Sequence, residues 1–446
     1  MTLLHNCTIV NEGLSRHGYV VTEGQRISQA GVGDPDAALM QRCGKAIDLQ
    51  GALLLPGVID EHVHFREPGM TRKADIASES RAALVGGVTS FMDMPNNSPL
   101  TTTIDTLEAK FRRAAEVSPI NYSFYIGATN DNIPLLTSSD VDYSRVCGVK
   151  AFLGSSTGGM LLSDSKAKRE LFTKIGTIVA VHSEDESIIR QNRQTAVARW
   201  GQDPPLFAHG LIRSAQACYE STLSAVRLAQ ECGTRLHVCH VSTASELQLL
   251  AKANEGKACR RITSEAVIAH LLFTEADYGR LGARIKCNPA VKTAADREAL
   301  RQAVRGGQID TLATDHAPHL LGEKLGGCTR AASGMPMVQF SLVMALELFS
   351  PELVAEKMCH APARLYGIED RGRVKPGYYA DLTAVRQLPQ GHTISDADVV
   401  SKCGWTPLEG TTVHHQVMMT MVNGHVAYSD GKIDEAARGM ELRFRH

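Results

Sequence analysis

Between about residues 53 and 365, short apolar runs alternate with segments whose apolar residues recur every three or four positions. The runs are typical of buried strands, and the spacing between them is typical of amphipathic helices such as KADIASESRAALVGG, IDTLEAKFRRAAEV and ESTLSAVRLAQEC. The eight predicted strands are LLLPGVIDEHVHF (53–65), TSFMDMP (89–95), NYSFYIGAT (121–129), VCGVKAFLG (146–154), TIVAVHSE (177–184), RLHVCHVS (235–242), RRITSEAV (260–267) and DTLATDHAPH (310–319). Because strands that alternate with helices favour parallel βα units, we predict an α/β fold closed into a TIM-like (β/α)8 barrel.

The two ends of the chain have a different pattern. Residues 1–52 and 371–446 carry alternating strands broken by Gly and Asn turns, as in GRVKPGYYADLTAV and MVNGHVAYSDGK. Neither end holds enough apolar surface to fold well alone. We therefore expect residues 53–365 to form the barrel and both ends to pair into one small β-sandwich domain beside it.

Composition indicates a globular protein and argues against several classes. The 446 residues are 43% hydrophobic and 21% charged, and 47 basic against 48 acidic residues give a net charge of −1. This balance argues against a nucleic-acid surface, and no apolar run approaches the ~20 residues of a membrane span. The first residues, MTLLHNCTIVNEG, become polar too early for a signal peptide, and the eleven cysteines form no CxxC pair. We therefore expect a cytoplasmic protein without disulfides.

Candidate chemistry begins with two histidines in DEHVHFREPG. His62 and His64 stand at positions i and i+2 at the end of the first predicted barrel strand. Side chains two apart on a strand share a face, so both imidazoles can reach one metal ion. Such a pair also arises by chance, but active sites of this fold form at the carboxyl ends of the strands.

Three other strand ends supply residues of the same kind. His182 ends the fifth strand, His240 the sixth and Asp315 the eighth. A single buried histidine is usually structural, and an aspartate before His-Ala-Pro can be a cap, but a common position at one rim favours a joint site. Nitrogen ligands with one carboxylate suit zinc best, although manganese or cobalt would also fit.

The sixth strand also offers a competing pair, His237 and Cys239. Both residue types can bind metals. Because they alternate with His240, we expect them to face the outer helices and to serve packing if His240 faces the barrel mouth.

A site for two metals needs a bridging group, and Lys150 at the end of the fourth strand is the candidate. A lysine ammonium beside two dications is electrostatically unfavourable. A neutral lysine amine can instead add carbon dioxide to give a carbamate, whose two oxygens can bind one metal each. Most lysines extend to solvent or pair with an acid, and the residues alone leave both interpretations of Lys150 open.

Six segments resemble the dihydroorotases of the amidohydrolase superfamily in order and spacing. They are PGVIDEHVHFREPG (56–69), DMPNN (93–97), GVKAFLGSSTG (148–158), VHSE (181–184), HVCHVS (237–242) and ATDHAPH (313–319), with FREPG and TDHAPH the most specific. The terminal segments are also similar to that superfamily's β-sandwich. The resemblance implies a cyclic amidohydrolase that opens and closes the ring of dihydroorotate in pyrimidine (UMP) biosynthesis.

The resemblance also implies roles for the residues at the rim. It implies two zinc ions with six protein ligands: His62, His64 and Asp315 on the first ion, His182 and His240 on the second, and Lys150 as the carboxylated bridge. Two such ions lower the pKa of a shared water and polarise the amide carbonyl. Asp315 would accept the proton of that water and pass it to the leaving nitrogen.

Four further residues match family positions that contact the substrate. Arg66, in FREPG, offers a planar guanidinium suited to a carboxylate, although outside this context an exposed surface arginine is commoner. Asn96 and His319 match the family's second and third contacts, and the alternative for Asn96 is a Pro-Asn turn. Asn288, in KCNPAVK, matches an asparagine that touches the substrate ring, although many relatives read NPPLR there and Ala269 stands where a histidine is frequent.

Two alternatives remain open. Allantoinases and hydantoinases (dihydropyrimidinases) share the metal scaffold, but a ring substrate without a carboxylate gives no reason for Arg66, which those groups usually lack. Some superfamily members have lost the metal and serve as scaffolds, yet all six ligand positions are filled here. We expect a small-molecule substrate and no nucleic-acid or membrane partner; family members are often homodimers, but no sequence feature identifies an interface.

Overall fold

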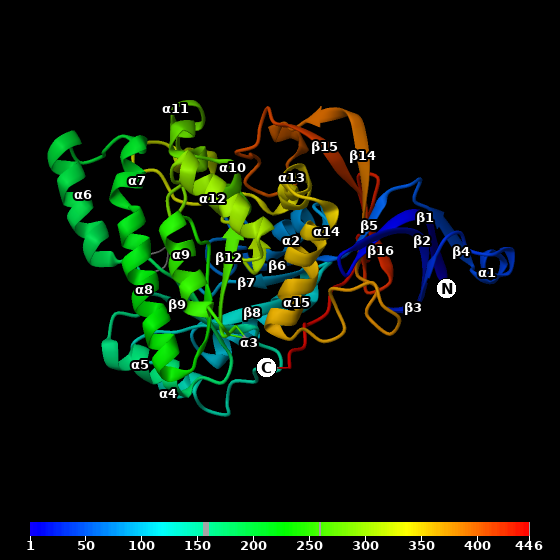
Figure 1. The fold of residues 1–446 in the computed structure, drawn as a ribbon, viewed down its shortest axis with the longest axis horizontal. Helices are drawn as coiled ribbons and strands as arrows, with labels where there is room; N and C mark the ends of the chain where they lie inside the picture. Colours follow the sequence, from blue (N-terminus) through cyan, green and yellow to red (C-terminus); the bar gives the residue numbers. More distant parts are fainter. Residues whose placement is uncertain (155–159, 258–259, 446) are drawn as a thin grey trace.

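The structure, a computed structural model, describes residues 1–154, 160–257 and 260–445, and it shows a barrel with a sheet at one side (Figure 1). Residues 155–158 of the motif GVKAFLGSSTG lie outside the described residues. Among the described helices, none combines the length and apolar character needed to cross a membrane.

Eight parallel strands form the barrel in chain order: β6 (Val58–Val63), β7 (Val88–Asp93), β8 (Asn121–Gly127), β9 (Gly148–Phe152), β10 (Ile178–His182), β11 (Arg235–Val238), β12 (Ile262–Val267) and β13 (Thr311–Ala313). The first and last strands meet through a parallel bridge between Val63 and His316. The Thr314 hydroxyl reinforces this closure by donating to Asp60 Oδ2 at 2.6 Å. The predicted barrel is therefore confirmed.

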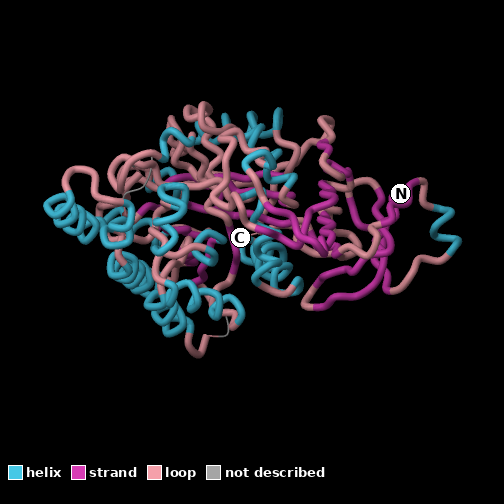
Figure 2. Tube along the Cα trace, turned by 90° about the horizontal axis from the view of Figure 1, so that it is seen from above, coloured by secondary structure: helices cyan, strands magenta, loops and turns pink. Residues whose placement is uncertain are grey.

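Helices cover the outside of the barrel, and they gather at the end of the molecule away from the terminal sheet (Figure 2). They are α2 (Ile76–Val85), α3 (Ile104–Val117), α4 (Ile133–Leu136), α5 (Ser165–Lys174), α6 (Glu186–Trp200), α7 (His209–Ile212), α8 (Ala215–Cys232), α9 (Ala244–Asn254), α10 (Ile268–Leu272), α11 (Tyr278–Leu281), α12 (Ala294–Arg305), α13 (Ser341–Leu348), α14 (Pro351–Ala355) and α15 (Ala361–Tyr366). Polar caps fix where several begin: the side chains of Asp75, Thr103 and Thr293 accept the first free amides of α2, α3 and α12. Aromatic packing then seats α3, whose Phe111 ring lies 4.9 Å from that of Phe124 in β8.

Both ends of the chain pair beside the barrel, as predicted, and the strands they contribute form one mixed sheet. Its strands are β1 (Thr2–Asn11), β2 (Leu14–Glu23), β3 (Arg26–Val32), β4 (Lys45–Asp48), β5 (Leu53–Pro56), β14 (Leu382–Thr393), β15 (Thr412–Val422), β16 (His425–Ser429) and β17 (Lys432–Ile433). The small helix α1 (Ala37–Arg42) precedes β4. The sheet curls so that distant strands meet, since the Ala380 amide donates to the Gln25 carbonyl at 2.9 Å and Gly424 lies against Gly24.

The long apolar run at residues 53–65 divides between the two sheets. Its first part, β5, pairs with β1 on one side and with β14 on the other, whereas β6 starts the barrel at Val58. One continuous stretch of chain therefore ties the terminal sheet to the barrel.

Candidate metal centre

A bulge in the first barrel strand lets neighbouring side chains point the same way. The pairing of β6 with β7 shifts register between Asp60 and Val63. An extra residue in one strand breaks the two-residue alternation of side chains. Glu61 is consequently buried in the barrel interior, and the next residue, His62, points into the barrel mouth together with His64.

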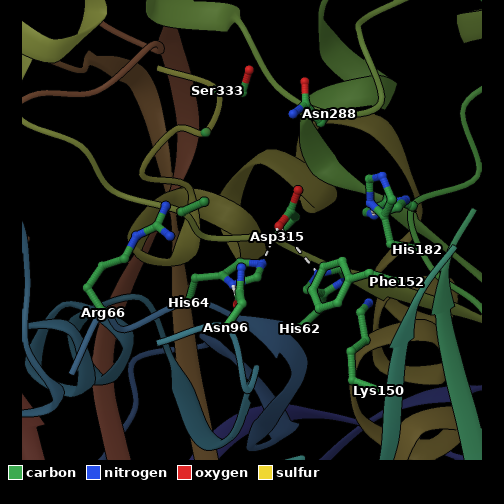
Figure 3. Close-up of a pocket in the computed structure, with 13 residues that line it drawn as sticks. His62, His64, Arg66, Asn96, Lys150, Phe152, His182, Asn288, Asp315 and Ser333 are labelled. Atoms are coloured by element: carbon green, nitrogen blue, oxygen red, sulfur yellow. Dashed lines mark hydrogen bonds and ion pairs between the residues drawn. The ribbon is translucent and has the colours of Figure 1, made fainter. Parts of the chain in front are cut away.

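His62 and His64 meet Asp315 at the barrel mouth (Figure 3). Their Nε2 atoms lie 3.4 Å and 3.1 Å from Asp315 Oδ1, and ligand atoms of all three residues lie within 4.8 Å of one another. Burial alone would raise the pKa of Asp315, but the two histidines outweigh it and hold that pKa below its ordinary value. The carboxylate is thus kept ionised, as a metal ligand or proton acceptor requires.

His182 and His240 form a second pair beside the first. His182 Nδ1 lies 2.9 Å from His240 Nε2, and the His240 ring is 5.3 Å from that of His62. Burial lowers the pKa of both His182 and His240, so both rings are neutral and keep a lone pair for a metal ion. His240 Nδ1 is buried with no hydrogen-bond partner among the described residues.

Other side chains orient three of these four rings through a second ring nitrogen. The Glu265 carboxylate accepts from His62 Nδ1, and His64 Nδ1 lies 2.8 Å from Asn96 Oδ1. Although burial opposes it, Glu265 raises the pKa of His62 well above its ordinary value. A carboxylate or carbonyl oxygen on the second ring nitrogen is the usual support of a metal-binding histidine.

The support of His182 extends one residue further. His182 Nε2 lies 2.9 Å from Glu184 Oε2, and the same carboxylate accepts from the buried guanidinium of Arg213. The three side chains form a buried chain behind the ring. His182 Nδ1 is then the nitrogen left facing the cavity.

Lys150 is completely buried between the two histidine pairs and the barrel interior. Its Nζ lies 2.9 Å from Cys239 Sγ, and no carboxylate of the described residues lies within ion-pair distance of Nζ. Lys150 is therefore neither exposed to solvent nor paired with an acidic side chain of the described residues, as most lysines are.

The prediction that His237 and Cys239 face the outer helices is wrong. His237 stands in register with Ala180, which stands in register with Lys150, so all three point into the barrel. The alternation fails because β11 ends at Val238 and His240 has a left-handed φ of 39°. Past the strand end, a backbone turn aims His240 to the same side as Cys239.

The chemistry of this donor set fits borderline divalent cations such as zinc. Four imidazoles and one carboxylate converge on the cavity, which Lys150 also lines. The structure thus brings together all six residues that the sequence singles out as metal ligands.

Arg66 lies on the other side of the cavity. The residue is buried, its Nε donates to the Pro318 carbonyl at 3.1 Å, and its Nη2 lies 3.1 Å from His319 Nε2. Burial lowers the pKa of Arg66 to about 10, and no ion pair joins it to any other described residue. A buried cation without an anion is costly unless a ligand supplies one.

Asn288 and the segment around Ser333 line a further part of the metal cavity (Figure 3). Asn288 Oδ1 is buried with no hydrogen-bond partner among the described residues. Lys324 holds the Ser333 segment by donating to the carbonyls of Ala332 at 2.7 Å and Gly334 at 2.6 Å.

The sequence analysis did not select four residues that the structure places in or behind the site: Ser333, Lys324, Glu184 and Glu265. A glutamate inside a buried strand, as in RITSEAV, is the signal that could have revealed Glu265.

The sequence profile described as the amidohydrolase family matches residues 53–427. This chain belongs to the amidohydrolase family. The curated dihydroorotase of Lactobacillus acidophilus is 31% identical to this amidohydrolase, over 96% of this chain and 99% of the relative. The dihydroorotase of Halobacterium salinarum is 34% identical, over 87% and 89%.

Solved structures superpose closely on this chain. An L-hydantoinase (dihydropyrimidinase) from Arthrobacter aurescens matches with a TM-score of 0.91 and 26% identity, over 99% of both chains. A dihydropyrimidinase from Brevibacillus agri shares the fold with a TM-score of 0.89 at 21% identity, over 100% of this chain and 99% of the other. The amidohydrolase is thus a cyclic amidohydrolase of the dihydroorotase and hydantoinase group, for which a small cyclic amide is the implied substrate.

Proposed function

We propose that this amidohydrolase is a dihydroorotase. It would hydrolyse the cyclic amide of (S)-dihydroorotate to N-carbamoyl-L-aspartate and, in reverse, close the ring in pyrimidine (UMP) biosynthesis. The observation that carries the proposal is Arg66, a buried guanidinium at the metal cavity that forms no ion pair with the described residues. Dihydroorotate carries a carboxylate, whereas hydantoin and dihydrouracil do not.

The proposed metal site uses the six residues already described. His62, His64 and Asp315 would hold one zinc ion, His182 and His240 the other, and Lys150 would bridge them as a carbamate. The burial of Lys150 beside the histidines, without an acidic partner among the described residues, supports this role. When bound, the two ions would polarise the amide carbonyl and lower the pKa of the attacking water.

Asp315 is the residue best placed to move the proton. Its side chain lines the cavity, and its lowered pKa keeps it an acceptor at neutral pH. It would take the proton of the attacking water and return it to the ring nitrogen as the amide bond breaks.

The other wall of the cavity would hold and orient the substrate. Arg66 would bind the carboxylate, with Asn96 and His319 beside it. Asn288, whose Oδ1 lacks a partner among the described residues, would accept from a ring N–H. These contacts would direct the amide carbon towards the metal side.

The test is ring opening of dihydroorotate, followed by ultraviolet absorbance, beside dihydrouracil, hydantoin and allantoin. We expect kcat/KM for dihydroorotate to exceed that for each uncharged ring. Faster turnover of dihydrouracil or hydantoin would instead identify a hydantoinase. No turnover, with no zinc retained after loading with zinc and bicarbonate, would support a metal-free scaffold.

A further inference from the structure

A second cavity, of about 680 Å³, lies at the opposite end of the barrel from the metal centre. Its walls include the first residues of β10 and β11, the residues before β12, the loop before β13, and α15. The metal centre occupies the carboxyl ends of the strands, whereas this cavity occupies the amino ends. Its volume lies in the range of small-molecule sites, roughly 300–1,000 Å³.

Positive side chains dominate the wall of this cavity. Its charged residues are Arg235, Arg260, Arg261, Lys357 and Arg364, against Asp310 and Glu356. The whole chain carries a net charge of only −1. The excess of positive charge is therefore a local feature of this end of the barrel.

The two carboxylates are already engaged with the protein. Glu356 accepts from Arg364 Nη2 at 2.7 Å, and Asp310 Oδ2 accepts from the Ser264 amide at 2.9 Å. Arg260 reaches Asp310 only at 3.6 Å, and Arg261 makes no side-chain hydrogen bond or ion pair with the described residues. Arg261 is thus the cation of this wall that has no partner among the described residues.

Lys357 is the least exposed cation of this wall, and its Nζ donates to the Ile309 carbonyl at 2.6 Å. Burial lowers the pKa of Lys357; the carboxylates of Asp310 and Glu356 oppose this shift, and the guanidinium groups of Arg260 and Arg364 add to it. Cations this close repel one another unless enough negative charge lies among them, and here five cations face two carboxylates.

We propose that this cavity binds a compact polyanion of the polyphosphate class, such as the phosphate chain of a nucleoside triphosphate. Several guanidinium groups on separate elements suit a ligand with several phosphates, because each planar fork can bind one phosphate in a bidentate manner. Apolar walls at Ile178, Leu236 and Leu365 would contact the uncharged part of a nucleotide. The site is independent of the proposed reaction, because none of its residues lines the metal cavity.

The test is isothermal titration of the zinc-loaded enzyme with tripolyphosphate, adenosine triphosphate and orthophosphate at constant ionic strength. The test variants are Arg261→Ala and Arg260→Ala/Arg261→Ala. The matched control is Arg112→Ala/Arg190→Ala, which removes two exposed arginines that make no side-chain hydrogen bond or ion pair with the described residues. Any binding of these anions to zinc would be equal in the two double variants. Only a difference in affinity between the two variants therefore measures binding to the cavity.

We expect both triphosphates to bind the wild-type chain and the control double, and orthophosphate to bind much more weakly. Kd should rise about tenfold for Arg261→Ala and further for the test double, with catalysis unchanged. Since the exposed Arg261 side chain makes no hydrogen bond or ion pair with the described residues, that variant should fold normally. No triphosphate binding to the wild-type chain, or equal affinity in the test and control variants, would overturn the proposal.

Discussion

The two halves of the metal cavity are completed in different ways. On the metal side, the rings of His62, His64 and His182 each have a fixed protein partner on the nitrogen that faces away from the site. On the substrate side, Arg66 is buried without a counter-ion and Asn288 Oδ1 is buried without a hydrogen bond among the described residues. Because buried polar groups are normally satisfied, three of the four metal-side rings are pre-organised by the protein and the substrate half awaits a ligand.

The largest effect is expected from removing the bridge of the metal half. Lys150→Met keeps much of the buried volume but has no amine, so it can form no carbamate. We expect kcat/KM for dihydroorotate to fall by about 10⁴-fold or more, the scale seen when one member of a catalytic unit is lost. Zinc per chain, measured by elemental analysis, should fall below two.

The charged counterpart of this variant is Lys150→Arg. The guanidinium keeps a positive charge at this position but cannot add carbon dioxide, so Lys150→Arg should be as inactive as Lys150→Met. If either variant kept two zinc ions and full activity, the carbamate would be refuted.

The next effect concerns the unpaired cation of the substrate half. Arg66→Ala should lower kcat/KM for dihydroorotate by about 100-fold, because a buried charge-assisted contact of ~3 kcal/mol is lost. Turnover of dihydrouracil, which has no carboxylate, should change little. Parallel steady-state kinetics with the two rings measure the difference.

The control for Arg66→Ala is Arg72→Ala, which removes an arginine whose side chain is 71% exposed on the same segment. It should leave both activities near the wild-type values. If Arg66→Ala lowered kcat/KM equally for dihydroorotate and dihydrouracil, Arg66 would shape the cavity and would not bind the substrate carboxylate.

A smaller effect is expected behind His182. Glu184→Gln keeps the shape of the side chain but weakens the acceptor on His182 Nε2, so the affinity for the second zinc ion should fall by roughly 10–100-fold. Competition with a chelator measures this affinity. The control Glu220→Gln, at an exposed position of α8, should leave it unchanged.

Removing the charge of Glu184 also removes its buried ion pair with Arg213, so the melting temperature should fall. Excess zinc should restore activity if the carboxylate acts through metal affinity. Activity that stays low at saturating zinc would contradict the positioning role.

Much of this fold and site could be predicted because its patterns are local. Apolar runs and helical spacing are properties of short segments, and they indicated the eight strands and placed the candidate ligands at the strand ends. The division of the apolar run 53–65 between β5 and β6 could not be predicted. The pairing of β5 with β14 depends on residues more than 300 positions away in the sequence.

The orientation of individual side chains was harder to predict. Two-residue alternation holds only within an uninterrupted strand, and here the bulge in β6 and the left-handed φ of His240 interrupt it. Arg66 and Asp315 also have left-handed φ values, 68° and 48°. Such non-glycine residues cost about 1–2 kcal/mol each and persist only where the surrounding contacts fix them, which sequence patterns do not reveal.

The smallest effect is expected at His270, which supports the substrate half from behind. His270 Nε2 lies 3.0 Å from the carbonyl oxygen of Pro289, the residue after Asn288. Burial lowers the pKa of His270 from 6.5 to about 4. Between these values the unfolded chain binds a proton that the native chain does not, so the free energy of unfolding should fall as the pH drops from about 6.5 to about 4.

His270→Gln keeps a donor for Pro289 but cannot bind this proton. Relative to the wild-type chain, its free energy of unfolding should therefore rise by about 1–3 kcal/mol between pH 7 and pH 4.5, measured by urea unfolding. The exposed His425→Gln should gain much less, and an equal pH response in His270→Gln and the wild-type chain would show that His270 is not the buried neutral group described here.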